Sequence, residues 1–173
     1  VRLSDAARAR VTANRAYAED FALAEPLLSQ ASKHKDDAAL LSAVAGVRVV
    51  QQRLDEAVEL FRGVLELNSQ DLAALNNLAT LLSEQAESRP EALRYIDRAI
   101  EIAGPQPGLL DTKGTILLLD GKAEDAVPLL EQAAASSLTD PRYHFHLAVA
   151  YDRSGLPEKA RAAYLTARKN QLS

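Results

Sequence analysis

Hydrophobic residues return every three or four positions along much of this chain, which is the period of an amphipathic helix. Residues 54–65 show the pattern most clearly, because apolar side chains recur there at that interval with charged residues between them. The apolar positions of this segment are Leu54, Ala57, Val58, Phe61, Val64 and Leu65. The pattern predicts an all-α chain in which such stripes form the core between helices.

A small residue recurs at a nearly constant interval and divides the chain into units. The intervals are 33, 35, 34 and 34 residues, between Ala24, Ala57, Ala92, Ala126 and Ala160. Each unit would hold two helices, and the small residue would let them approach closely. Because one pair of helices buries little apolar surface, we expect the units to stack into a single array. We number each unit so that its alanine is residue 20, with one extra residue before the alanine of the third unit. The predicted units are then 5–37, 38–71, 72–106, 107–140 and 141–173.

Several signals place the ends of helices. Asp140 followed by Pro141 predicts an N-cap and a first helical residue. Ser88 with Glu91 three residues later predicts a capping box at the start of another helix. Pro128 falls inside the second helix of the fourth unit and predicts a slight bend or a late helix start there. The extra residue of the third unit is placed in the turn at 86–90.

The last unit carries the strongest resemblance to a known family. Counted from Pro141, it has the residue types of the tetratricopeptide repeat, a helix-turn-helix unit of 34 residues, at positions 7, 8, 11, 15, 20, 24 and 27. These residues are Leu147, Ala148, Tyr151, Gly155, Ala160, Tyr164 and Ala167. The resemblance implies a right-handed α-solenoid of about five units and about ten helices, and a protein that holds another protein. Residues 109–155 also look like the terminal repeats of bacterial members of this family.

Composition narrows the classes of function. The 173 residues carry a net charge of -4, are 47% hydrophobic and contain no Cys. No basic stripe suits a phosphate backbone, so we expect no nucleic-acid partner. No apolar stretch approaches the ~20 residues of a membrane span, so we expect a soluble protein, cytoplasmic or periplasmic if bacterial. The chain lacks an initiator Met, and we interpret it as a segment of a longer protein.

Candidate catalytic and metal-binding groups are few. His144 and His146 are two residues apart, so on a helix they point in different directions, and the HExxH spacing of a zinc site is absent. The glycines are single and do not form a phosphate-binding loop. Acidic pairs such as Asp55 and Glu56 lie at helix starts, where the helix dipole accounts for them. We therefore expect no catalytic residue, metal or cofactor, and a protein that is not an enzyme.

The resemblance implies where a partner would bind. In that family the first helices of successive units line a concave groove, through positions 2, 5, 6, 9, 12 and 13. The hydroxyl, amide and guanidinium groups at these positions could bind an extended peptide. The candidate groove residues are Asn76, Asn77, Thr80, Asp111, Thr112, Thr115, Arg142, Phe145, His146, Val149 and Arg153. Ser83, Leu118, Leu119 and Asp152 occupy further groove positions.

A second function stays open beside a scaffold for a peptide or protein partner. The array could instead be a structural module that forms homo-oligomers, or packs on flanking domains, through its open ends. In support of this alternative, no separate polar helix follows the last unit, so its second helix is expected to expose Ala163, Leu165 or Ala167.

Overall fold

The computed structural model describes residues 25–26, 28–30, 33–34 and 36–171. Within these ranges the regular secondary structure is helical throughout, which confirms the all-α prediction. Most of the first predicted unit, 5–37, lies outside the described residues. The chain divides into two compact units, Val1–Leu67 and Asn68–Ser173.

The first compact unit contains the helices α2 (Ala38–Val50) and α3 (Leu54–Leu67), which pack together as a pair. Asp37 caps α2, because its side chain accepts a hydrogen bond of 2.9 Å from the Leu40 amide. The two helices share a core of buried apolar side chains, since each turns one stripe inward. These side chains are Leu41, Val44, Ala45, Ala57, Phe61 and Val64.

A cluster of ion pairs lies beside α2 in this first unit. Arg48 is buried, and its Nη1 lies 2.6 Å from Oε2 of Glu25. Arg53 Nη1 lies 2.6 Å from the other Glu25 oxygen, and Arg53 Nε lies 2.6 Å from Glu56. Hydrogen bonds from Arg48 and Arg53 hold the pKa of Glu25 at about 2, well below its usual 4.5. The buried guanidinium is thus paired rather than isolated, as a buried charge requires.

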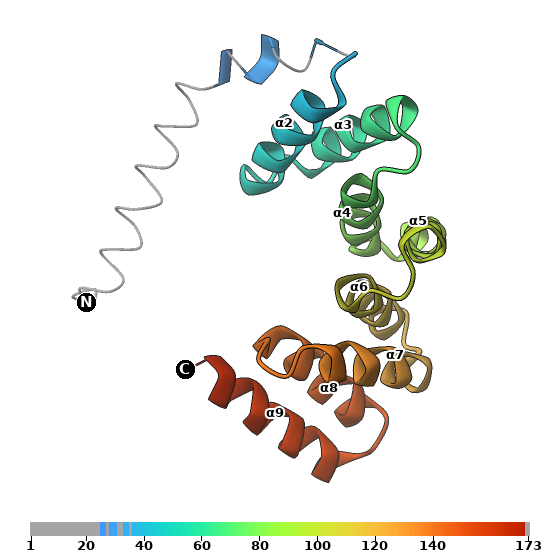
Figure 1. The fold of residues 1–173 in the computed structure, drawn as a ribbon, viewed down its shortest axis with the longest axis vertical. Helices are drawn as coiled ribbons and strands as arrows, with labels where there is room; N and C mark the ends of the chain where they lie inside the picture. Colours follow the sequence, from blue (N-terminus) through green and yellow to red (C-terminus); the bar gives the residue numbers. More distant parts are fainter. Residues whose placement is uncertain (1–24, 27, 31–32, 35, 172–173) are drawn as a thin grey trace, which may run out of the picture. The chain divides into compact units, whose positions relative to one another are not determined.

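The second compact unit contains six α-helices that pack as three successive pairs, α4 with α5, α6 with α7 and α8 with α9 (Figure 1). Each pair also contacts the next, through α5 with α6 and through α7 with α8. The first helices of the pairs, α4, α6 and α8, contact one another in order. A short 3-10 helix, Ala86–Ser88, precedes α5. The bounds are α4 Leu72–Ser83, α5 Arg89–Ala103, α6 Pro107–Leu119, α7 Ala123–Ser136, α8 Pro141–Arg153 and α9 Pro157–Gln171.

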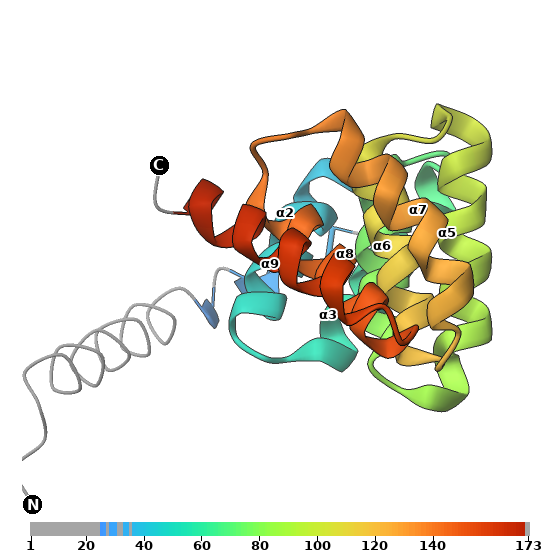
Figure 2. The same ribbon diagram turned by 90° about the horizontal axis from the view of Figure 1, so that it is seen from below.

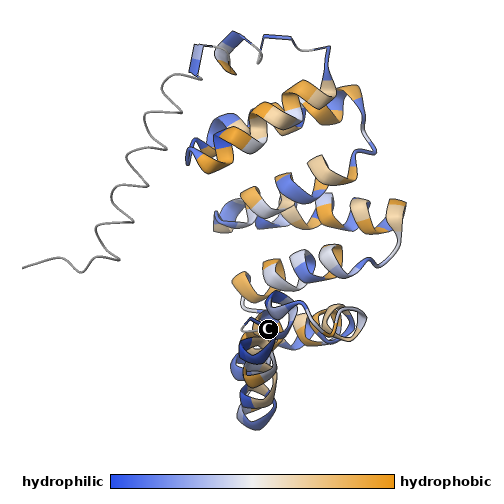
Figure 3. Cartoon of the chain, turned by 60° about the vertical axis from the view of Figure 1, so that its left-hand side comes forward, coloured by the Kyte–Doolittle hydropathy of each residue, from blue (hydrophilic) through white to orange (hydrophobic). Residues whose placement is uncertain are grey.

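The three pairs of the second compact unit lie within residues 72–106, 107–140 and 141–173. Figure 2 shows α6 to α9 from below as two neighbouring pairs. The ribbon in Figure 3 alternates between hydrophobic and hydrophilic segments along the helices, as amphipathic helices do. Eight of the ten or so predicted α-helices fall within the described residues. The solenoid prediction is therefore confirmed for the described pairs.

The recurring alanine is buried in each described pair. Ala57, Ala92 and Ala126 are fully buried, and Ala160 is 9% exposed. The partner position in the first helix is equally tight: a Cβ added to Gly114 would lie 2.6 Å from Cγ of Leu130. Only a residue without a side chain fits there at the present helix separation, since interiors are close-packed.

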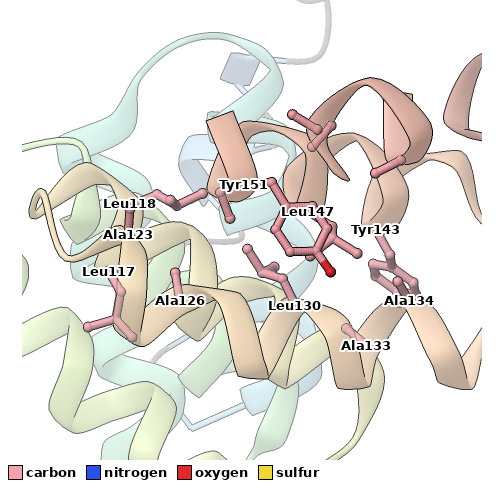
Figure 4. Close-up of a cluster of buried hydrophobic side chains, with 14 of the residues drawn as sticks. Leu117, Leu118, Ala123, Ala126, Leu130, Ala133, Ala134, Tyr143, Leu147 and Tyr151 are labelled. Carbon is pink, nitrogen blue, oxygen red and sulfur yellow. The ribbon is translucent and has the colours of Figure 1, made fainter. Parts of the chain in front are cut away.

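The core between α7 and α8 joins one pair to the next (Figure 4). Leu130 of α7 is fully buried among Tyr143, Leu147 and Tyr151 of α8. The Tyr151 hydroxyl donates a hydrogen bond of 2.5 Å to Glu131 of α7. Burial, and then this bond to a carboxylate, raises the pKa of Tyr151 to about 12. Leu130, at position 24 of its unit, therefore fills the gap to the next pair.

The turn inside each pair uses a left-handed backbone where the sequence places position 15. The φ angle is 77° at Gly121, 72° at Gly155 and 60° at Gln52. Glycine adopts this conformation without strain, whereas a residue with a Cβ costs about 1–2 kcal/mol. The third predicted unit differs, because its extra residue forms the 3-10 helix in the predicted turn.

Two of the predicted helix starts need correction. Asp140 caps α8 as predicted, accepting a hydrogen bond of 2.9 Å from the Arg142 amide. Ser88 precedes α5 as predicted, but its side chain makes no capping bond, because the 3-10 helix holds its backbone at φ -93° and ψ -8°. Pro128 does not delay α7, which begins at Ala123. The helix already has more than one turn before Pro128, its sixth residue, and the proline removes the backbone hydrogen bond that would otherwise reach the carbonyl of Glu124.

The exposed end of the last pair also differs from expectation. Ala163 and Ala167 of α9 are buried, at 8% and 5% exposure, because they face α8. Leu165 is exposed as expected. The larger apolar exposures in this pair include those of Phe145 and Tyr164, at 48% and 50%.

Candidate functional site

A small polar pocket opens between α4, α6 and α8, and its volume is about 130 Å³. Each of these helices is the first of its pair, so the pocket lies on the face that the predicted groove occupies. Five of the candidate groove residues line it, together with Ser83, which also occupies a predicted groove position, and with Ile116. The lining residues are Thr80, Ser83, Asp111, Thr112, Thr115, Ile116 and His146.

An ion pair or hydrogen bond between α6 and α8 closes one side of the polar pocket. Nδ1 of His146 lies 2.7 Å from Oδ1 of Asp111, although the two residues are 35 positions apart. The side chain of Asp111 is only 14% exposed and that of His146 is 32% exposed. A short bond between largely buried groups is protected from competing water, so it fixes both side chains at the pocket wall.

Two buried polar atoms near the pocket have no partner among the described residues. They are Oγ1 of Thr115, which lines the pocket, and Oδ1 of Asn76 in the neighbouring helix α4. A buried polar atom without a hydrogen bond is rare, because desolvating it without compensation costs about 1–3 kcal/mol. The hydroxyl of Thr115 can both donate and accept, so a ligand in the pocket would have a bonding group available.

The hydroxyls of the other pocket residues are bonded within their own helices. Thr80 donates to the carbonyl of Asn76 at 2.9 Å, and Thr112 donates to that of Gly108 at 3.0 Å. Ser83 is buried and donates to the carbonyl of Thr80 at 2.7 Å. Their oxygens still have free lone pairs, so this side of the pocket presents acceptors.

Three other candidate groove residues, together with His146, lie at a separate place, a cleft between α8 and α9. Two adjoining hollows of about 340 Å³ and 380 Å³ form it, and both are lined by Phe145 and Tyr164. Of the predicted residues, Arg142, Phe145, His146 and Val149 lie along the cleft. We call it the α8–α9 cleft, lined by Pro141, Arg142, Phe145, His146, Ala148, Val149, Asp152, Pro157, Ala160, Arg161, Tyr164, Ala167, Arg168 and Gln171.

The candidate residues therefore divide between two surfaces, and only His146 belongs to both. Asn76, Asn77 and Arg153 line neither hollow. Arg153 instead donates a hydrogen bond of 2.7 Å to the carbonyl of Leu118. Leu118 itself is a buried core residue and not a groove residue. It belongs to the apolar core that joins the last two helix pairs.

The charge of Arg142 is largely neutralised by a near neighbour. Its Nη2 lies 2.8 Å from Oδ2 of Asp140, the residue that caps α8. This bond lowers the pKa of the Asp140 carboxyl and raises the pKa of the Arg142 guanidinium. Arg142 remains 71% exposed, so it can still turn toward a ligand.

Sequence reasoning missed the contribution of the second helix of the last pair. Tyr164, Arg161 and Arg168 of α9 line the α8–α9 cleft, but the family pattern assigns the groove to first helices alone. The signal was present in the sequence, since the residues 34 positions earlier are Leu130, Val127 and Ala134. A change from aliphatic to charged or aromatic at equivalent positions marks a changed environment.

The described residues show neither a cluster of metal ligands nor a helix suited to a membrane span. No group of three or more His, Asp or Glu side chains there is placed to hold a metal ion. None of the described helices is both long and apolar enough to cross a membrane.

Comparison with known families gives one match that covers most of the chain. The family model for the tetratricopeptide repeat matches residues 47–107 and 112–171. The two matched segments begin and end inside the helix pairs described above. The search of curated proteins found no match.

Solved structures with the same fold come from several proteins. TTC0263, a thermophilic TPR protein of Thermus thermophilus, is 20% identical with a TM-score of 0.72, over 93% of this chain and 88% of that one. A crystal structure of MamA protein is 16% identical with a TM-score of 0.72, over 91% and 86%. YrrB, described as a TPR protein with an unusual peptide-binding site, is 19% identical with a TM-score of 0.64, over 83% and 74%. These likenesses show the fold.

Proposed function

This chain belongs to the tetratricopeptide repeat family, and from that premise we propose that it binds a peptide segment of a partner protein in the polar pocket between α4, α6 and α8. The family and the fold support a protein-interaction scaffold. The binding of a peptide at this particular pocket is the proposal. The observation that carries it is the unpartnered, buried hydroxyl of Thr115 in the pocket wall.

The chemistry of the pocket suits a peptide group. A peptide N–H can donate to the carboxylate of Asp111 or the hydroxyl oxygen of Thr112, and a peptide carbonyl can accept from Thr115. Ile116 adds one apolar wall. A hollow of about 130 Å³ admits one peptide group or one small side chain, so neighbouring residues of the ligand would run along the exposed face of α4, over Thr80 and Asn77. YrrB, with its peptide-binding site, provides a parallel within the same fold.

We propose a non-enzymatic role, without a cofactor. Proteins of this family are generally scaffolds. The His146–Asp111 pair resembles part of a catalytic set, but general acid-base catalysis also needs a positioned group to attack or leave. Of the two pocket hydroxyls on α6, that of Thr112 is bonded to a helix carbonyl and that of Thr115 has no base as a partner. The pair is better explained as the wall of a binding pocket.

The proposal is tested by blocking the pocket without disturbing the core. Thr80 is exposed at the pocket edge, so Thr80→Arg should fill the opening and leave the fold intact. Gln132→Arg adds the same charge on an exposed position of α7 that lines none of these hollows. Each variant is immobilised and exposed to a lysate of the source organism, and retained proteins are identified by mass spectrometry.

The expected result is a protein retained by the unmodified chain and by Gln132→Arg but lost by Thr80→Arg. Circular dichroism must show equal helicity in all three. If Thr80→Arg retains the same proteins as the unmodified chain, the pocket is not the binding site and the proposal is wrong.

A further inference from the structure

The α8–α9 cleft exposes aromatic side chains from both helices of the last pair. Phe145 and Tyr164, one from each helix, face it with about half of each side chain exposed. Ala148, Val149 and Ala160 add a small apolar floor. Two exposed aromatic rings around one hollow form the kind of patch that marks an interaction site. The cleft is separate from the polar pocket, apart from the shared His146.

The same surface on the preceding pair is occupied by a helix. There, α8 packs on α6 and α7, and its contact buries Leu118, Leu130 and Ala134. The equivalent residues of the last pair, 34 positions later, are Asp152, Tyr164 and Arg168, and all three are exposed. The cleft is therefore equivalent to the surface of α6 and α7 on which α8 packs, and no described residue covers it.

The α8–α9 cleft differs in charge from the equivalent surface that α8 covers. Val127 and Ala134, where α8 packs, correspond to Arg161 and Arg168 in the last pair. Neither arginine makes an ion pair with a described residue. Residues 141–171 carry six Lys or Arg against two Asp or Glu, a net charge of 6 − 2 = +4. The whole chain has a net charge of -4, so the positive charge is concentrated on this last pair.

We propose that the α8–α9 cleft binds an acidic amphipathic helix of a partner protein. The apolar stripe of that helix lies on Phe145 and Tyr164, and its carboxylates meet Arg161 and Arg168 at the rim. A helix is the fitting shape because the repeat already seats one at the equivalent place. An acidic one is required because arginines brought next to an apolar helix face would lose water without gaining a partner.

The helix α8 itself shows the spacing that such a surface accepts. Tyr143, Leu147 and Tyr151, which are four residues apart, form the stripe that packs on α7. The bound helix should therefore carry apolar residues at intervals of three and four. Its carboxylates should flank that stripe, where the planar guanidinium of an arginine can bond both carboxylate oxygens.

Two synthetic peptides with a helix-stabilising crosslink provide the probe. Both keep the apolar residues of α8, and both replace its exposed positions, one peptide with Glu and the other with Lys. Affinities for the full chain are measured by fluorescence anisotropy at low and at physiological salt. We expect the Glu peptide to bind at least about tenfold more tightly than the Lys peptide, and the difference to shrink as salt rises.

Charge reversal in the cleft gives the decisive comparison. Arg161→Glu with Arg168→Glu should reverse the preference, so that the Lys peptide binds more tightly. Arg94→Glu with Arg98→Glu, on exposed positions of α5, changes the net charge equally and should leave the order unchanged. Tyr164→Ala should weaken the binding of both peptides.

Several results would overturn the proposal. Equal binding of the two peptides, no binding of either, or the same shift from the α5 control would each remove it. So would a dimer that forms with rising concentration and is abolished by Tyr164→Ala, because the cleft would then belong to a second copy. Thr80→Arg should not change the affinity for the peptides, so this test is independent of the proposed peptide pocket.

Discussion

The close contact between α6 and α7 gives a sharp prediction at Gly114. Replacing Gly114 with Ala adds one methyl group in the middle of α6. At the present helix separation, the new carbon would lie 2.6 Å from Cγ and 2.8 Å from Cδ2 of Leu130. Leu130 is fully buried among the side chains of α8, so it has no free space into which to turn. The substitution should therefore push the two helices apart.

Two opposing effects set the size of the change in the free energy of unfolding. Alanine in place of glycine inside a helix stabilises by about 0.5–1 kcal/mol. Overpacking a close-packed core costs about 1–3 kcal/mol. The clash is the larger effect, so Gly114→Ala should destabilise the second compact unit by about 1 kcal/mol.

Gly46→Ala provides the matched comparison, because Gly46 also lies inside a helix but an added Cβ there meets nothing within 4 Å. It should stabilise by about 0.5–1 kcal/mol. Both variants are measured by urea unfolding followed by circular dichroism. A third variant combines Gly114→Ala with Leu130→Ala, where the obstructing side chain is gone and the added methyl should no longer destabilise.

If Gly114→Ala stabilises as much as Gly46→Ala does, the added methyl does not clash with Leu130 and the prediction is wrong. It is also refuted if the effect of Gly114→Ala is the same with and without Leu130, since the double-mutant cycle isolates that contact.

Two further predictions concern the core and the ion-pair cluster. Ala126→Leu should lower the free energy of unfolding by about 1–3 kcal/mol. Ala135→Leu, at an exposed position of the same helix, should change it by less than about 0.5 kcal/mol. Equal urea midpoints for the two variants would mean that the repeat register is wrong. Glu25 has a pKa of about 2 in the folded chain because Arg48 and Arg53 bond its carboxylate, so its contribution to stability is complete above pH 4.5 and is lost as the pH falls toward 2. Glu25→Gln should therefore lower the melting temperature at pH 7, and the deficit should disappear by about pH 2; a deficit that is constant with pH would contradict the assigned cause.

Much of the fold follows from the sequence because the repeat constrains it several times over. The alanine interval located the contacts at Ala57, Ala92 and Ala126, and all three are fully buried. Local capping was less predictable, since the Ser88 side chain competes with a backbone turn that the extra residue creates. The prediction of exposed residues at the end of the array was partly wrong, because helical periodicity alone did not show that Ala163 and Ala167 face α8.

The sequence predicted the helix face on which each candidate residue lies, but not which of these residues share one opening. The family pattern places Thr80, Asp111 and Thr115 on one face, and the structure brings them to one pocket. It could not show that Phe145 belongs to another opening, because that depends on whether a further helix covers α8. Nor could it find the bond between His146 and Asp111, which depends on the separation of two helices whose bonded residues are 35 positions apart.

Site-specific photocrosslinking determines whether a partner binds on the face formed by α4, α6 and α8. A benzophenone amino acid is placed at Thr80, beside the polar pocket, and in a second protein at Gln132, on the exposed side of α7. Both proteins are irradiated in a lysate of the source organism, and the adducts are identified by mass spectrometry. We expect a specific adduct from position 80 and none from position 132. Adducts from position 132 alone, or the same adducts from both, would contradict this expectation.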